Sequence, residues 1–257
     1  GISKDGGLYV PESLPQIDNL GAMKDMDYKS IAFHIMSKFL TDFEPEVLNY
    51  CINNAYNSKF ISDEVAPVVQ VGDTFFLELY HGTTLAFKDM ALSILPYLLK
   101  ESMNIQGINK DIVILTATSG DTGKAALEGF ANIDCIKIIV FYPENGVSDI
   151  QKRQMITQEG DNTFVVGING NFDDAQTGVK NIFNDIEFKG LLEEDNFILS
   201  SANSINIGRL IPQIVYYFHG YLTILRQNKI KIDEKINIVV PTGNFGNILA
   251  AFYSKKM

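Results

Sequence analysis

The hydrophobic pattern of the chain changes near residue 67. Before that point, apolar residues recur at every third or fourth position over residues 28–39, which predicts a helix. Residues 46–56 follow a proline, which is favoured in the first turn of a helix, and predict a second one. We therefore expect a mainly helical subdomain over residues 1–66 and an α/β region over residues 67–257.

Strands and helices alternate through the α/β region. A hairpin of VVQV and FFLEL, turned at Gly72 and Asp73, comes first. A predicted helix over residues 90–103 follows it, and further helices separate the later strands, among them 173–186 and 205–225. The predicted strands are DIVILTAT (111–118), CIKIIVFYP (135–143), NTFVVGI (162–168), NFILSSA (196–202) and INIVVPTG (236–243). This alternation predicts a parallel sheet flanked by helices, with ligands bound at the carboxyl ends of the strands.

The segment HGTTLAFKDM (81–90) places a lysine where lysine is a poor structural choice. Lys88 lies in or just before the first turn of a predicted helix, where the helix dipole disfavours a cation by roughly 0.3–1 kcal/mol. A lysine held against this dipole and an apolar wall is pushed toward its neutral form, which is the nucleophile that bonds to a carbonyl cofactor. The alternative is that Lys88 only covers apolar surface with its stem.

Two glycine-rich turns each follow a predicted strand and open a helix. In TATSGDTG (116–123), glycines allow a tight turn around helix N-terminal amides, which suit a carboxylate or a phosphate. The plainer interpretation is that Ser119 or Asp121 caps the helix. In PTGNFGN (241–247), the glycines let the backbone close on a ligand like a phosphate cup, and an ordinary loop between strand and helix explains the pattern equally well.

A nucleophilic lysine and a phosphate cup together point to pyridoxal phosphate. The aldehyde of this cofactor would join the lysine, and its phosphate would anchor it in the cup. The other glycine turn is then available for the carboxylate of an amino acid. Neither turn has the spacing of a nucleotide-binding fingerprint, which makes a Rossmann dehydrogenase a weaker alternative.

Composition narrows the range of partners. The chain has 257 residues, of which 46% are hydrophobic, and a net charge of −10, which argues against non-specific nucleic-acid binding. Cys51 and Cys135 lack metal-binding or redox spacing, and the three histidines form no metal-ligand pattern, so we expect no metal. His34, within the first predicted helix, is more plausible as a structural residue than a catalytic one. Without a membrane-length apolar run or signal peptide, a cytoplasmic protein with no membrane contact is expected.

Five motifs together resemble the threonine synthase family. They are DGGLYVPE, HGTTLAFKD, LTATSGDTG, SSANSINIGR and PTGNFGN, and they follow one another at family-like spacing along nearly the whole chain. The resemblance implies a fold-type II pyridoxal 5'-phosphate enzyme with parallel sheets flanked by helices in two lobes, an architecture shared with tryptophan synthase β. It implies conversion of O-phospho-L-homoserine and water to L-threonine and phosphate by a β,γ-replacement.

The resemblance also assigns residues. Lys88 would bind the cofactor covalently and move protons, and Phe87 would pack near it. The loop around the cofactor phosphate would be formed by Gly243, Asn244, Phe245, Gly246 and Asn247. The substrate carboxylate would be received by Thr118, Ser119, Gly120, Asp121 and Thr122. The substrate phosphate would be bound by Asn203, Ser204 and Arg209. Arg209 suits this role because guanidinium presents a planar fork of donors, and a surface salt bridge is its alternative.

Two departures from the family stand out. Thr83 occupies a position where the family usually has proline, which changes the stiffness of the loop and not its chemistry. Family members are also much longer, so we expect a truncated chain without the C-terminal part that lies near the pyridine nitrogen. The resemblance further implies that approximately residues 105–170 form a smaller mobile lobe and the remainder of the α/β region belongs to the larger lobe.

Several alternatives remain at this point. The same fold could carry a phospho-lyase or a serine/threonine dehydratase, which act on related amino acids. A non-catalytic truncated fragment is the distant alternative. The expected partner is the small-molecule substrate, without nucleic acid, in a monomer or weak homodimer.

Overall fold

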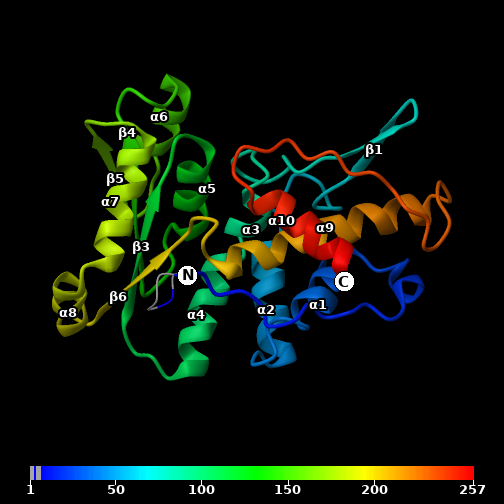
Figure 1. Cartoon of the computed structure of the whole chain (residues 1–257), viewed down its shortest axis with the longest axis horizontal. Coiled ribbons are helices and arrows are strands. Elements are labelled where there is room, and N and C mark those ends of the chain that lie inside the picture. Colours follow the sequence, from blue (N-terminus) through cyan, green and yellow to red (C-terminus); the bar gives the residue numbers. More distant parts are fainter. Residues whose placement is uncertain (1–2, 4–6) are drawn as a thin grey trace. The chain divides into compact units, whose positions relative to one another are not determined.

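The computed structural model describes residue 3 and residues 7–257 (Figure 1). They fall into two compact units. The sheet unit contains Leu95–Asn206 together with the start of the chain up to Leu8, and the helical unit contains Tyr9–Ile94 and Ile207–Met257. Gly6 of the DGGLYVPE motif lies outside the described residues.

A four-stranded parallel sheet forms the centre of the sheet unit. Its order is β5-β4-β3-β6, and all neighbouring strands are parallel. The strands are β5 (Thr163–Ile168), β4 (Ile136–Pro143), β3 (Asp111–Ala117) and β6 (Phe197–Ser201). In the register, Ile114 of β3 lies opposite Ile138 of β4 and Ser200 of β6. The inner strand β3 is buried along nearly all of its length, as its continuous apolar run predicts.

Helices cover both faces of this sheet. On one face, α7 (Phe172–Asn184) packs Ala175 and Val179 against Val113 and Leu115 of β3. Side chains alternate between the faces of a strand, and α5 (Asp121–Phe130) approaches the opposite face. The remaining helices of the sheet unit are α4 (Leu95–Gln106), α6 (Asp149–Ile156) and α8 (Ile186–Glu194). The predicted α/β arrangement is therefore confirmed.

The helical unit is built around α9 (Ile207–Arg226), in which every residue from Arg209 to Gly220 is buried. Packed against α9 are α1 (Tyr28–Met36), α3 (Asp89–Leu92) and α10 (Gly246–Lys256) (Figure 1). Further elements of this unit are η1 (Leu20–Met23), α2 (Pro45–Ala55), β1 (Val68–Val71) and β2 (Thr74–Leu77). None of the helices in the described part of the chain, α9 included, is long and apolar enough to cross a membrane.

The predicted single helix over residues 90–103 is wrong in one respect. The chain forms two helices, α3 and α4, which are separated by Ser93 and Ile94. Pro96 explains the break, because it has no N–H to donate to the carbonyl of Leu92 and its ring would crowd that carbonyl.

The fifth predicted strand, over residues 236–243, is also wrong. These residues are irregular, and Val239 is 93% exposed. An apolar run becomes a strand only where neighbouring strands supply hydrogen-bond partners, and this run pairs with neither edge of the parallel sheet. The local strand preference of such a run cannot reveal that a neighbouring strand is missing, because pairing depends on residues far away along the chain.

We predict that Gly123→Ala destabilises the sheet unit by about 1–3 kcal/mol. A Cβ at this position would lie 2.5 Å from the sulfur of Met155, 2.6 Å from Cγ2 of Thr118 and 3.0 Å from Cγ1 of Val140. Gly178→Ala in α7 is the matched control, because a Cβ there meets nothing within 4 Å and alanine favours a helix. Urea unfolding should show a lower midpoint for the first variant only, and equal midpoints would contradict the packing described here.

We also predict a loss of stability in acid that depends on His219. Burial, with a smaller contribution from Arg226, lowers the pKa of His219 from 6.5 to about 4. The unfolded chain therefore takes up a proton before the folded one, and stability present above pH 6.5 falls as the pH drops toward 4, by at most about 3 kcal/mol. His219→Phe keeps an aromatic ring beside Tyr28 and should flatten this part of the curve of unfolding free energy against pH. An unchanged slope in the variant would assign the acid sensitivity to other groups.

Candidate active site

Lys88 lies at the N-terminal boundary of α3, as its sequence position predicts. Its backbone carbonyl accepts hydrogen bonds from the amides of Ala91 and Leu92, which form the first turn. Its Nζ lies 4.5 Å from the centre of the Phe87 ring, so the two neighbouring side chains predicted for the cofactor site are in contact. A cation over an aromatic face is stabilised by the ring, which holds the lysine stem in a defined direction.

A buried carboxylate holds the loop that leads to Lys88. Asp89 is only 3% exposed, and it accepts hydrogen bonds from the amide of Thr84 at 2.8 Å and the hydroxyl of Thr84 at 2.5 Å. Gly82 lies against the same carboxylate, since a Cβ there would be 2.5 Å from its Oδ2. Leu85, between them, has a φ of +58°, an uncommon value for a residue with a side chain. The loop is therefore folded tightly around Asp89.

A hydrogen bond from Tyr56 also holds α3. The hydroxyl of Tyr56, at the end of α2, donates a 2.7 Å hydrogen bond to the carbonyl of Met90. Tyr56 is fully buried, so this bond is shielded from water. The two residues after Lys88 therefore both hold α3 in place, Asp89 through its side chain and Met90 through its backbone carbonyl.

The predicted phosphate loop leads directly into α10. Phe245 is the residue before the helix, and its side chain is 75% exposed. Among the described residues, no side chain caps this helix end. The first amides of a helix have no partner within it, and the helix dipole makes the end attractive to anions. Residues 243–247 therefore place backbone donors where an anion can reach them.

Arg209 lies in the first turn of α9 and is almost fully buried. This position excludes the surface salt bridge that the sequence left open. Burial lowers the pKa of Arg209 to about 10, and the nearby Tyr216 partly opposes this shift. The guanidinium remains charged at neutral pH, and a buried cation of this kind is stabilised by an anionic ligand.

In the sheet unit, the turn after β3 is organised by Thr118. Its hydroxyl oxygen accepts hydrogen bonds from the amides of Gly120 at 3.0 Å and Gly123 at 2.9 Å. The carboxylate of Asp121 accepts a 2.9 Å bond from Gln151, the residue that completes the capping box of α6. Ser119 is exposed. The turn therefore presents Ser119 outward, while Thr118 and Asp121 hold its shape.

Asn203 joins two motifs that are far apart in the sequence. Its side chain donates to the carbonyl of Ala117 at 3.0 Å and accepts from the amide of the same residue at 3.3 Å. The parallel pairing of β3 and β6 places their carboxyl ends at one edge of the sheet, next to Ser204 and the turn at residues 118–122. The structure thus brings the predicted carboxylate turn together with Asn203.

The predicted residues are divided between the two units. The sheet unit contains the turn at residues 118–122 with Asn203 and Ser204. The helical unit contains Phe87, Lys88, Arg209 and residues 243–247, and the helices α3 and α10 both pack on α9.

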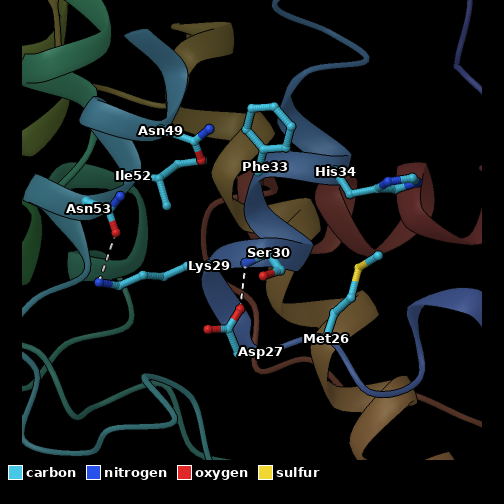
Figure 2. Close-up of a pocket in the computed structure, with 9 residues that line it drawn as sticks. All are labelled: Met26, Asp27, Lys29, Ser30, Phe33, His34, Asn49, Ile52 and Asn53. Atoms are coloured by element: carbon cyan, nitrogen blue, oxygen red, sulfur yellow. Dashed lines mark hydrogen bonds between the residues drawn. The ribbon is translucent and has the colours of Figure 1, made fainter. Parts of the chain in front are cut away.

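A separate surface pocket of about 410 Å³ lies between α1 and α2 (Figure 2). None of the predicted site residues lines it. Lys29 donates to Asn53 at 3.2 Å, and Asp27 accepts from the amide of Ser30 at 2.8 Å, so polar groups of the pocket bond to one another. His34 also lines it, and burial together with Lys38 holds the pKa of His34 below its ordinary value.

Sequence reasoning missed the residues that position the predicted site. Asp89 and Thr84 hold the loop before Lys88, and Tyr216 and Tyr217 of α9 bond to Asn247 at the beginning of α10. Gln213 bonds to the backbone of α9. The available signal was the presence of hydrogen-bonding side chains within a helix that is otherwise apolar on all sides. Such groups need partners inside the protein.

Two known families match the chain. Residues 1–56 match the family described as Threonine synthase N terminus, and residues 65–254 match the family described as Pyridoxal-phosphate dependent enzyme. A human protein named threonine synthase-like 1 is 41% identical, over all of this chain and 36% of its own length. Threonine synthase of Pseudomonas aeruginosa is 40% identical, over all of this chain and 53% of its own length.

Solved structures give the same result. The structure of PLP-bound threonine synthase from Brucella melitensis matches with a TM-score of 0.87 and 38% identity, over all of this chain and 53% of that one. Threonine synthase from yeast matches with a TM-score of 0.83 and 35% identity, over all of this chain and 52% of that one. The chain thus spans about half, or less, of the length of these relatives.

Fold and similarity together define an α/β protein of the fold-type II class, with a parallel sheet flanked by helices. The chain belongs to the pyridoxal-phosphate dependent enzyme family. The predicted resemblance and fold class are confirmed, as is pyridoxal 5'-phosphate as the cofactor of the family.

We predict that Asp89→Asn loosens the loop before Lys88 and lowers the unfolding free energy by about 1–3 kcal/mol, because one of two bonds from Thr84 loses its carboxylate acceptor. Urea unfolding and limited proteolysis of residues 82–88 measure the two effects. Asp42→Asn, at an exposed position, is the control and should change neither. Equal protease resistance of all three proteins would refute the role of Asp89.

Proposed function

We propose that this chain carries the cofactor-binding part of an enzyme that converts O-phospho-L-homoserine and water to L-threonine and phosphate. The observation that carries the proposal is the buried Arg209 in the same unit as Lys88. A guanidinium binds carboxylate and phosphate alike. Because we assign the substrate carboxylate to the turn at residues 118–122, we assign Arg209 to a phosphate, which the substrates of a serine or threonine dehydratase lack.

The residues of the helical unit fit pyridoxal 5'-phosphate. The uncapped start of α10 offers backbone donors to the cofactor phosphate, contributed by residues 243–247. Around Gly243 an added Cβ would meet nothing within 4 Å, which leaves space beside the loop. Lys88 would bind the cofactor aldehyde through Nζ, and Phe87 already lies against that atom. When bound, the cofactor supplies an electron sink for the carbanions that the reaction requires.

Lys88 would carry out the proton transfers. With the cofactor bound, the free neutral Nζ of Lys88 would act as general base on the Cα proton and then on a Cβ proton of the substrate, giving up the first proton before it accepts the second. The Cγ–O bond breaks and phosphate leaves with the bonding electrons. Water then adds its oxygen at Cβ, and protons return to the carbon chain. The atoms balance as one water consumed and one phosphate released.

The other residues would hold the two charged ends of the substrate. We assign the α-carboxylate to the turn formed by residues 118–122, where Ser119 is the exposed hydroxyl. We assign the phosphate to Arg209 of the helical unit.

A phospho-lyase that releases an α-keto acid is the second candidate. It would use the same lysine and the same buried arginine, and relatives named threonine synthase-like 1 match as well as those named threonine synthase. Product analysis after incubation with O-phospho-L-homoserine separates the two, because only one reaction yields L-threonine. A cytoplasmic location and a small-molecule substrate complete the proposal.

We predict that Lys88→Ala abolishes covalent binding of the cofactor and lowers turnover by at least about 10²–10⁴-fold, because the variant loses both the attachment point and the base. The measurement is a visible absorption spectrum of the chain with added pyridoxal phosphate, before and after borohydride reduction, followed by peptide mapping. The reduced adduct should be found on Lys88 of the unmodified chain.

Lys59→Ala, at an exposed position outside the predicted site, is the matched control and should behave like the unmodified chain. A reduced adduct on another lysine, or full turnover by Lys88→Ala, would overturn the assignment of Lys88.

A further inference from the structure

Asn247, the second residue of α10, is buried, although the loop that leads into this helix is exposed. It is 9% exposed, although the preceding Phe245 is 75% exposed. Its Oδ1 accepts hydrogen bonds from the hydroxyls of two consecutive residues of α9, Tyr216 and Tyr217, the latter at 2.6 Å. The Tyr217 hydroxyl also lies 3.3 Å from the backbone carbonyl of Asn247. Both phenols thus converge on the first turn of α10.

This convergence is not a general property of helix packing. Consecutive residues of a helix point about 100° apart and do not share a face. Tyr216 and Tyr217 nevertheless lie with their ring centres 4.8 Å apart and reach one oxygen atom. Two phenols on one acceptor fix the position of that acceptor in two directions, whereas one would leave it free to swing.

Both hydroxyls remain donors under physiological conditions. Burial raises the pKa of Tyr217 to about 12 and holds the pKa of Tyr216 well above its ordinary range. The two phenols therefore stay protonated, and a buried amide oxygen that accepts two hydrogen bonds is costly to move, since each lost bond leaves a polar atom unsatisfied.

The same pair is connected to Arg209. The hydroxyl oxygen of Tyr216, whose proton goes to Asn247, also lies 3.2 Å from Oε1 of Gln213. Nε2 of Gln213 donates to the carbonyl of Arg209 at 2.9 Å. One buried network in the helical unit therefore joins the beginning of α10 to the first turn of α9. These are the two elements that we assign to the phosphate groups of cofactor and substrate.

We propose that Tyr216 and Tyr217 are positioning residues, which hold Asn247 so that the first amides of α10 point toward a phosphate group. The inference rests on the proposed function, because it takes the start of α10 as the cofactor-phosphate site. The pair acts through the backbone of the loop and touches neither cofactor nor substrate.

The test compares two ligands that differ only in the phosphate, pyridoxal phosphate and pyridoxal. Binding of each to the full chain is followed by absorbance titration, and the covalent adduct is trapped with borohydride. Tyr216→Phe and Tyr217→Phe keep the rings and remove the hydroxyls. We expect each substitution to lower the affinity for pyridoxal phosphate about 5–10-fold, which is the effect of one lost hydrogen bond. The affinity for pyridoxal should change less than twofold.

Tyr221→Phe is the matched control. It lies on the same helix, and its hydroxyl donates to the carbonyl of Glu234 at 3.2 Å, away from α10. Tyr221→Phe should leave the affinity for both ligands unchanged. Urea midpoints of all variants identify any general loss of stability.

A double-mutant cycle gives a second readout. Asn247→Ala removes the acceptor, so it should reproduce the selective loss, and Tyr217→Phe should have no further effect in that background. Additive losses would contradict the proposed route through Asn247.

The outcomes separate the two proposals. Selective loss of pyridoxal phosphate in the tyrosine variants supports positioning. Unchanged affinity, or an equal loss of both ligands, overturns it and leaves the proposed function intact. If the unmodified chain itself shows no preference for pyridoxal phosphate over pyridoxal, the start of α10 is not a phosphate site and both proposals fall.

Discussion

The enclosure of α9 is the constraint on which the helical unit depends. In a helix that is buried on all sides, a polar side chain is costly unless it finds a hydrogen-bond partner inside the protein. Tyr216, Tyr217 and Gln213 satisfy this requirement by bonding to α10 or to the backbone of α9. Since α3 and α10 both pack on α9, this helix supports both the segment that begins at Lys88 and the loop at residues 243–247.

Features governed by local chemistry were predictable from the sequence. The continuous β-branched run at residues 111–118 identified the buried strand β3, because an apolar strand covered by helices on both faces needs no polar face. The other three strands of the parallel sheet were identified from shorter apolar runs that alternate with predicted helices. Lys88 was placed at a helix start because the apolar pattern begins just after it. These elements carry most of the predicted site residues.

Features governed by distant partners were not predictable. The helix α8 has no buried residue, so its sequence carries little of the periodicity that reveals an amphipathic helix. Residues 236–243 have strand composition, and their irregular course follows from the lack of pairing. The tyrosine pair, Asn203 and Asp89 act through contacts that close only after folding, and no spacing in the sequence indicates which backbone atoms they reach.

The division of the chain has a consequence for its modularity. Apart from a few residues at the start, the sheet unit is one uninterrupted stretch, Leu95–Asn206, whereas the helical unit is assembled from segments on either side of it. The sheet unit therefore has the topology of an inserted domain. Such a domain can be exchanged or lengthened without changing the order of the segments that form the other unit. Sequence changes within Leu95–Asn206 therefore leave the segments that carry Lys88, α9 and α10 intact.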